Sequence, residues 1–158
     1  MIRLAGETDR PWLVAMGLRF VQSTSYAALL PITPAAVNVL IDNLLEQGVI
    51  FVAVLGDRPI GMIAGRLMPS GPEMPLIVAE EVAWWVEPEH RDGRAGYQLL
   101  CQFEGWAVQS RADVCKMVAP AGTTVGGFYE RRGYRAVETV FAKVLHGNVR
   151  SPRSPRQE

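Results

Sequence analysis

Apolar residues recur with a helical period in two stretches of the first third of the chain. Pro11 and Pro34 stand near the starts of these stretches, where a missing backbone N–H is harmless, and Thr33 is a suitable N-cap for the second. Gly48 follows the second stretch and is expected to adopt the left-handed conformation that ends many helices. The pattern predicts two helices, with the inward positions Trp12, Leu13, Met16, Phe20 and Val21 in the first and Val37, Leu40, Ile41, Leu44 and Leu45 in the second.

From residue 49 the pattern becomes typical of strands. Residues 49–55 are apolar throughout, as in a strand that is covered on both faces, and turn-forming residues separate them from a return strand. The resulting order, β-α-α-β-β-β-α-β-α-β, predicts one mixed sheet with helices on its faces. The later predicted elements are strands over 60–68 and 76–86, a helix over 95–110, a short strand over 114–118, a helix over 123–132 closed by Gly133, and a final strand over 134–145.

The composition is that of an ordinary globular domain, with 158 residues of which 49% are hydrophobic and 20% charged. Basic and acidic residues balance at 16 each, so no overall field attracts nucleic acid or an anionic membrane. Residues 146–158 are rich in Pro, Ser and Arg and show no apolar period. We therefore expect a domain over residues 1–145 and a basic tail over 146–158. The tail is either disordered, as its composition predicts, or packed on the domain or across a homodimer.

Several classes of protein and site are disfavoured. No apolar stretch reaches the roughly 20 residues of a membrane span, and the N-terminus does not resemble a signal peptide. Cys101 and Cys115 do not form a disulfide framework, and His90 and His146 are too far apart for a metal motif. Cys101 with His90 as a Cys–His hydrolase lacks an orienting third group. These features favour a cytoplasmic protein with free thiols and no metal.

The segment EEVAWWVEPEHRDGRAGYQLL, residues 80–100, leaves a strand and enters a helix. A helix N-terminus presents unpaired N–H groups and the positive end of the helix dipole. Gly93 and Gly96 would let a ligand approach the backbone, and Arg91 and Arg94 add positive charge. The turn is therefore suited to holding a phosphate, although a tight surface turn would have the same residues. It matches neither the P-loop nor the dinucleotide-binding pattern.

Two motifs resemble those of a known family, the GNAT superfamily of N-acetyltransferases. VEPEHRDGRAGYQLL, residues 86–100, is similar to its acyl-coenzyme A binding segment, V-x-P-x-x-[RQ]-x-x-G-x-[GA], although Arg94 stands where the first glycine is usual. GFYERRGY, residues 127–134, is similar to its second signature, FYxxxGF, with Thr123 in place of the usual Asn. The resemblance covers residues 2–145 and extends to the small members that phages and prophages often encode.

The resemblance implies an α/β (α+β) fold, a single-domain, mainly antiparallel mixed sheet flanked by helices. It also implies transfer of an acetyl group from acetyl-CoA to a primary amine of an unidentified acceptor, either a small molecule or a protein. A catalytically silent GNAT-fold binding or structural module, associated with a phage, is the alternative. The implied coenzyme-binding residues are Trp85, Val86, Arg91, Asp92, Gly93, Arg94, Ala95, Gly96, Tyr97, Thr123 and Phe128.

Acyl transfer to an amine requires a base that neutralises the amine and an acid for the leaving thiolate. Glu80 and Glu81 are adjacent in an otherwise apolar strand, where a lone buried carboxylate is costly. The register of the resemblance favours Glu80 as the base, with Glu81 as the alternative. Tyr129, whose unperturbed pKa is near ~10, is the implied acid. A purely structural interpretation would have one glutamate solvated, the other ion-paired and the tyrosine packed at a helix end.

Overall fold

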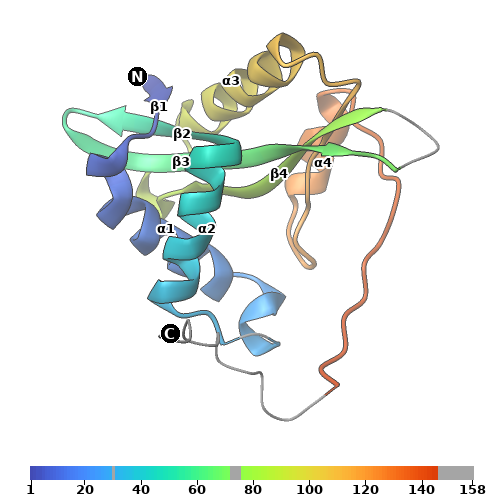
Figure 1. Cartoon of the computed structure of the whole chain (residues 1–158), viewed down its shortest axis with the longest axis horizontal. Helices are drawn as coiled ribbons and strands as arrows, with labels where there is room; N and C mark the ends of the chain where they lie inside the picture. The colour runs from blue at the N-terminus through green and yellow to red at the C-terminus, as the bar shows by residue number, and fades with distance from the viewer. Residues whose placement is uncertain (30, 72–75, 146–158) are drawn as a thin grey trace, which may run out of the picture.

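The computed structural model describes residues 1–29, 31–71 and 76–145, which form a five-stranded sheet with helices on both faces (Figure 1). The strands follow one another across the sheet in chain order, and all neighbours are antiparallel except β4 and β5, which are parallel. The mixed, mainly antiparallel sheet predicted from the sequence is confirmed, whereas the expected tail over 146–158 lies outside the described residues. The elements are β1 (Ile2–Leu4), η1 (Glu7–Asp9), α1 (Arg10–Gln22), η2 (Ser25–Ala28), α2 (Pro34–Gln47), β2 (Gly48–Leu55), β3 (Arg58–Pro69), β4 (Ile77–Val86), η3 (Pro88–His90), α3 (Ala95–Gln109), β5 (Val114–Lys116) and α4 (Val125–Arg131).

The start of α2 is formed as predicted, but its end is not. Pro34 is the first helical residue, and the Thr33 hydroxyl accepts a hydrogen bond from the Ala36 N–H at 3.2 Å. Gly48 has a φ of −138° and is already the first residue of β2, so the predicted left-handed conformation is wrong. A Cβ at Gly48 would lie 2.5 Å from the carbonyl oxygen of Gly65 on β3. Close packing of β2 against β3 therefore requires this glycine.

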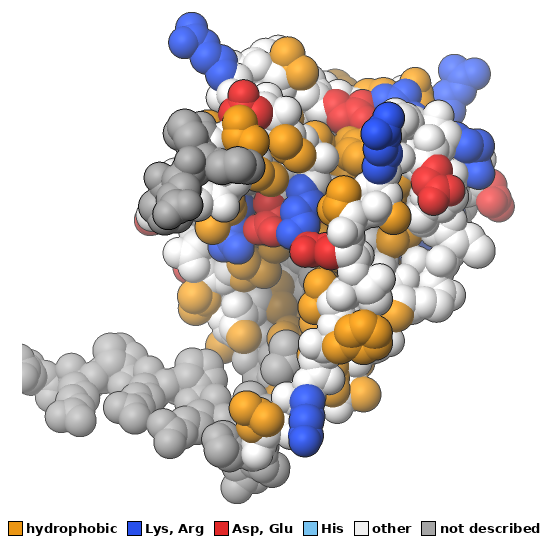
Figure 2. All heavy atoms as spheres, turned by 90° about the vertical axis from the view of Figure 1, so that its right-hand side faces the viewer, with side chains coloured by type: hydrophobic (Ala, Val, Ile, Leu, Met, Phe, Trp, Pro, Cys, Tyr) orange, Lys and Arg blue, Asp and Glu red, His pale blue; other side chains and the backbone are white. Residues whose placement is uncertain are grey.

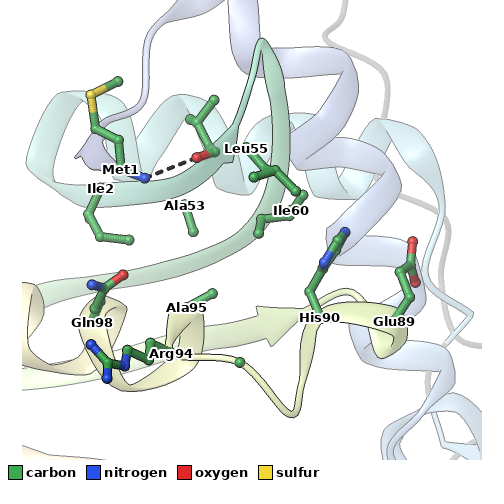
Figure 3. Close-up of a pocket in the computed structure, with 12 residues that line it drawn as sticks. Met1, Ile2, Ala53, Leu55, Ile60, Glu89, His90, Arg94, Ala95 and Gln98 are labelled. Carbon is green, nitrogen blue, oxygen red and sulfur yellow. Dashed lines mark hydrogen bonds between the residues drawn. The ribbon is translucent and has the colours of Figure 1, made fainter.

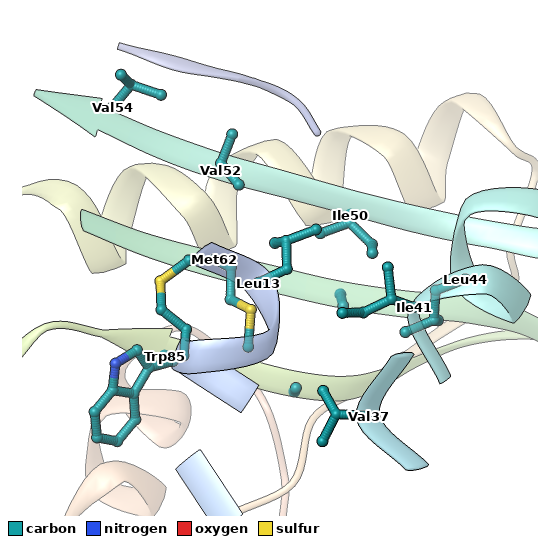
Figure 4. Packing of buried hydrophobic residues seen from close by; sticks show 12 residues of the cluster. Leu13, Val37, Ile41, Leu44, Ile50, Val52, Val54, Met62 and Trp85 are labelled. Atoms are coloured by element: carbon teal, nitrogen blue, oxygen red, sulfur yellow. The ribbon is translucent and has the colours of Figure 1, made fainter. Parts of the chain in front are cut away.

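Each face of the sheet has its own hydrophobic layer. One lies under α1 and α2 (Figure 4) and the other under α3. β2 is buried continuously from Val49 to Val54, as expected for a strand that is covered on both sides. None of the helices among the described residues is long and apolar enough to cross a membrane. The largest fully buried apolar side chains are Phe103, Leu13, Met16, Ile63, Leu99 and Leu100.

A β-bulge in β4 decides which of its side chains reach which face. Glu81 pairs with Gly65 and Ala83 pairs with Ala64, so Val82 is an extra residue on β4. Beyond the bulge Trp85 belongs to the layer under α1 and α2, whereas Trp84 packs against the layer under α3. The bulge thereby brings Glu81 and Trp84 to the same face, although they are three positions apart.

The predicted final strand over 134–145 is wrong. These residues form no regular element and extend away from the sheet on the side of β5 and α4 (Figure 1). The start of this segment contacts the domain, because the Tyr134 hydroxyl donates to Glu104 at 3.0 Å and Lys116 pairs with Glu138 at 2.8 Å. Further along, Val137 and Phe141 are 82% and 91% exposed. A strand requires a partner edge, and this segment does not lie along one.

Candidate active site

β4 and β5 run side by side at first and then diverge. Residues Val78–Glu80 pair with Val114–Lys116, and the edge of β4 from Glu81 to Val86 has no strand partner on that side among the described residues. Unpaired N–H and C=O groups of a strand edge can bind an extended ligand in the manner of an added strand. The place where the two strands separate, called the opening below, is therefore a candidate ligand-binding edge.

The Glu81 side chain spans this opening. One of its carboxylate oxygens accepts a hydrogen bond from the Val118 N–H at 3.0 Å, just beyond the end of β5. The residue is only 4% exposed. Burial raises the pKa of Glu81 to about 7, with the charge of Glu80 adding to the rise and the Val118 N–H opposing it. Glu81 therefore gains and loses a proton near neutral pH.

Tyr129 reaches the same point from α4. Its hydroxyl donates to the Val118 carbonyl at 3.2 Å, and its ring stacks on Trp84 with the centroids 5.8 Å apart. Phe128 also lies against Trp84, at 5.9 Å between centroids. Burial, with the charge of Glu81 as a second cause, holds the pKa of Tyr129 well above its ordinary value. The hydroxyl is therefore protonated at neutral pH.

Glu80 lies in a different environment. Its carboxylate pairs with Arg66 on β3 at 3.4 Å and with Lys116 on β5 at 3.6 Å, and it is partly exposed. The structure thus brings Tyr129 together with Glu81, while Glu80 is bound by two cations.

The turn between β4 and α3 is held by two arginines. Arg19 of α1 forms an ion pair with the buried Glu87. The Nε of Arg91 donates to the Val86 carbonyl at 3.0 Å, and its guanidinium lies 4.5 Å from the centre of the Trp85 ring. Arg91, predicted from the sequence as a charged phosphate ligand, is therefore folded back onto β4 in this structure.

The first turn of α3 offers backbone N–H groups. The first helical hydrogen bond runs from Gln98 to the Arg94 carbonyl, so the N–H groups of Ala95, Gly96 and Tyr97 precede it and have no partner within the helix. A Cβ at Gly96 would lie 3.5 Å from both Trp84 and Val86, which is ordinary contact. The start of α3 therefore borders the same space as Trp84. Asp92 and Gly93 belong to the turn itself, and the Gly93 N–H donates to His90.

Arg132 links the two helices that flank this space and was not identified from the sequence. Its guanidinium lies 5.0 Å from the centre of the Tyr97 ring on α3, donates to the Tyr97 hydroxyl at 3.2 Å and pairs with Glu104. The only signal in the sequence is its place within the FYERRGY motif, directly before Gly133. Thr123, in contrast, donates to the Pro120 carbonyl at 2.7 Å within the turn before α4.

A separate hollow of about 330 Å³ lies on the other side of the turn (Figure 3). It is bounded by the N-terminal residues, the ends of β2 and β3 and the start of α3, and the Met1 amine donates to the Val54 carbonyl beside it at 3.0 Å. Glu81, Trp84 and Tyr129 do not line it. This hollow therefore differs from the opening between β4 and β5.

The opening and the adjoining helix start fit an acyl-coenzyme A. The unpaired edge of β4 suits an extended amide-containing arm, and the N–H groups at residues 95–97 suit a phosphate. Trp84, Phe128 and Tyr129 supply an apolar wall between these two parts.

Comparison with known structures gives the same fold. A crystal structure of a transcriptional regulator from Bacillus halodurans C-125 is 17% identical, with a TM-score of 0.75 over 90% of this chain and 97% of that one. An aminoglycoside antibiotic 6'-N-acetyltransferase from Acinetobacter haemolyticus is 17% identical, with a TM-score of 0.72 over 92% and 99%. The aminoglycoside N-acetyltransferase AAC(6')-Iy, in complex with CoA, is 15% identical, with a TM-score of 0.71 over 90% and 92%.

Sequence comparison supplies the family. No curated protein matches the chain. A family model described as the acetyltransferase (GNAT) family matches residues 21–134, which include both motifs and most of the described elements. The chain therefore belongs to the GNAT family of acetyltransferases, which use acetyl-CoA to acetylate amines.

Proposed function

We propose that Glu81 and Tyr129 carry the two proton transfers when this chain acetylates a primary amine. The observation that supports this most directly is their meeting point, because Glu81 and Tyr129 bind the N–H and the carbonyl of the same residue, Val118. Both side chains lie where β4 and β5 separate. Glu80, which the sequence register favours, is the second candidate for the base.

Acetyl-CoA, when bound, supplies the acetyl group as a thioester. The edge of β4 up to Val86 would hold its extended arm, and the turn and the start of α3 would hold its phosphates through backbone N–H groups. In this arrangement Arg91 shapes the turn through Val86 and Trp85. The proposed coenzyme-binding residues remain Trp85, Val86, Arg91, Asp92, Gly93, Arg94, Ala95, Gly96, Tyr97, Thr123 and Phe128.

The proton affinities of the two side chains suit opposite roles. An amine acceptor is mostly protonated at neutral pH, and a carboxylate whose pKa is about 7 can remove that proton, directly or through water. Tyr129 keeps its own proton, since burial raises its pKa, and can donate it to the thiolate that leaves. Glu81 therefore acts as the base and Tyr129 as the acid.

Replacing Tyr129 by Phe tests the acid. This change keeps the ring stacked on Trp84 and removes only the hydroxyl, so acetyl-CoA binding should be retained while kcat falls by roughly 10²–10⁴-fold. The exposed Tyr26, changed to Phe, is the matched control and should leave kcat unaltered. A Tyr129→Phe variant with the wild-type kcat would show that the thiolate leaves without this acid.

The pH dependence of kcat/KM identifies the base. A base must be deprotonated, so the wild-type rate should rise as the pH increases through about 7, the pKa of Glu81. Glu81→Gln should abolish this rise, and Glu80→Gln should preserve it. The reverse result would assign the base to Glu80. If both variants keep the wild-type pH dependence of kcat/KM, neither glutamate is the base and the amine loses its proton to solvent.

The proposal also covers the amine acceptor, the division of the chain into domain and tail, and the cellular location. Two of the structurally similar proteins are aminoglycoside N-acetyltransferases, which makes aminoglycosides a reasonable first group of amines, beside small amines and protein amines. Residues 1–145 form the acetyltransferase domain and 146–158 an appended tail. A cytoplasmic location suits the free thiols of Cys101 and Cys115.

A further inference from the structure

The helix that carries Tyr129 is short and lies near the surface. α4 has seven residues, of which two are glycine and only Tyr129 is buried, and Thr124 does not cap its start through its side chain. Figure 2 views the domain from the side on which α4 lies in Figure 1, and charged side chains of both signs are spread among hydrophobic ones there. So short a helix has little stability of its own. Contacts with the rest of the domain therefore decide where the Tyr129 hydroxyl lies.

The residues that follow α4 fold back onto Tyr129. The Tyr129 carbonyl accepts the N–H of Arg132 at 2.9 Å and the N–H of Tyr134 at 3.1 Å. Gly133 between them has a φ of 89°, a left-handed conformation that glycine adopts without strain. The Tyr134 ring then lies beside the Tyr129 ring, with the centroids 5.7 Å apart. The placement of Arg132 and Tyr134 therefore affects the placement of Tyr129.

Both of these side chains end on one carboxylate of α3. Arg132 pairs with one oxygen of Glu104, and the Tyr134 hydroxyl donates to the other at 3.0 Å. The side chains of the ion pair are only 28% and 26% exposed, so water screens their attraction less than at an open surface. Hydrogen bonds to a charged carboxylate are also stronger than those between neutral groups. Glu104 therefore anchors both Arg132 and Tyr134.

The same contacts connect α4 to the start of α3. The Arg132 guanidinium lies 5.0 Å from the centre of the Tyr97 ring and donates to the Tyr97 hydroxyl at 3.2 Å. Tyr97 is in the first turn of α3, whose N–H groups are the proposed phosphate ligands, and Glu104 stands two turns further along the same face of this helix. The helix that would hold the coenzyme and the helix that carries the acid are thereby joined.

We propose that Glu104 positions Tyr129: through Arg132 and Tyr134 it sets the distance between the acid and the thioester of acetyl-CoA held at the start of α3. Glu104 is a positioning residue and not a catalytic one, because its contacts are with these two side chains. This role of Glu104 rests on the proposed function of Tyr129 as the acid. A displacement of about 1 Å can cost on the order of a hundredfold in rate, so loss of Glu104 lowers kcat while acetyl-CoA still binds.

Steady-state kinetics of thiol release by the full chain test this positioning, with acetyl-CoA and the amine that reacts fastest among aminoglycosides, small amines and peptides. Glu104→Gln keeps the shape of the side chain but has one acceptor oxygen instead of two. It should lower kcat by roughly 10–10²-fold and leave the KM for acetyl-CoA within about twofold of the wild type. Glu130→Gln, the same change at an exposed position of α4, is the matched control and should leave kcat unaltered. A Glu104→Gln variant with the wild-type kcat, or with a change in KM alone, would overturn the proposal.

A double variant shows whether Glu104 acts through Tyr129. In a chain that already carries Tyr129→Phe, Glu104→Gln should cause no further loss of kcat, because the hydroxyl that Glu104 positions is gone. Equal losses of kcat with and without Tyr129→Phe would mean that Glu104 acts independently of Tyr129, and would contradict positioning.

The single variants separate this role from the proposed function. A Tyr129→Phe variant with the wild-type kcat would remove the acid itself, and with it both the proposed function and the role of Glu104. An impaired Tyr129→Phe variant beside an unimpaired Glu104→Gln variant would refute the positioning alone. If Glu104→Gln does not fold, Tyr134→Phe takes its place, because it keeps the ring and removes only the hydroxyl that Glu104 binds. It should also lower kcat, and a wild-type kcat would overturn the proposal in the same way.

Discussion

Gly96 keeps the first turn of α3 open toward β4. A Cβ at this position would just touch Trp84 and Val86, and a longer side chain would enter the space beside them. Gly96→Glu should therefore block the N–H groups of the helix start and repel a phosphate. We expect the thermal shift caused by acetyl-CoA to be lost while the fold is retained.

The matched control for this change is Gly105→Glu, which adds the same side chain to the same helix at a position where a Cβ meets nothing within 4 Å. It should preserve the wild-type shift. An equal shift in the Gly96→Glu variant would place the phosphate site elsewhere.

The buried Glu81 carboxyl also makes stability depend on pH. Its pKa is about 7 in the folded protein and near 4.5 when unfolded, so the folded state binds more protons between these values. The free energy of unfolding should therefore fall as the pH rises through this window. Glu81→Gln keeps an oxygen that can accept from Val118 and removes the titration, so it should flatten this fall.

Urea unfolding at several pH values from 5 to 8 measures this effect. Glu46→Gln, at an exposed position of α2, is the control and should keep the wild-type slope. If Glu81→Gln keeps that slope too, then Glu81 does not titrate in this range.

Residue types supplied the candidates for the chemistry of the site but not their arrangement. Tyr129 and the glutamate pair were recognised from a motif and from carboxylates in an apolar strand. The choice between Glu80 and Glu81 depends on the bulge at Val82, which changes the face of every later side chain of β4. Alternation along a sequence carries no mark of such an extra residue, so the structure was needed to bring Glu81 and Tyr129 together.

At the scale of elements, the close packing of β3 against β4 and α3 depends on Gly65. A Cβ there would lie 2.5 Å from both the Glu80 carbonyl and the Phe103 ring. Neither a paired strand nor a fully buried ring can move easily, so Gly65→Ala should destabilise the domain by about 1–3 kcal/mol, as overpacking commonly does. Gly105→Ala, in open space within α3, should instead stabilise it by roughly 0.5–1 kcal/mol. Urea denaturation of both variants measures the difference, and a Gly65→Ala variant as stable as the wild type would contradict this packing.

The helices and strands whose apolar side chains pack within the domain were predictable from the sequence. The predicted strand over 134–145, which needs an adjacent strand to pair with, was not. The apolar periods of α1, α2 and α3 and the buried run of β2 reflect contacts within the domain. Residues 134–145 also have a strand-like composition, but they do not pair with any edge of the sheet. Composition indicates which residues can form a strand, but whether a strand forms depends on a free edge nearby in the folded protein.

At the scale of the whole molecule, the acetyltransferase domain should function without the tail. The described elements end before residue 134, and the site lies between β4, β5, α3 and α4. A chain that ends at Leu145 should therefore fold and keep its thermal shift with acetyl-CoA. Loss of folding on removal of residues 146–158 would contradict the division into domain and tail.

The central claim is that this chain acetylates an amine with acetyl-CoA, using the opening between β4 and β5. Release of free thiol from acetyl-CoA, measured with a panel of aminoglycosides, small amines and peptides, tests it most directly. At least one amine should raise the rate above the amine-free rate, mass spectrometry should show the acetylated product, and Tyr129→Phe should reduce that rate. A protein that acetyl-CoA stabilises but that acetylates none of these amines would instead be a coenzyme-binding module without catalytic activity.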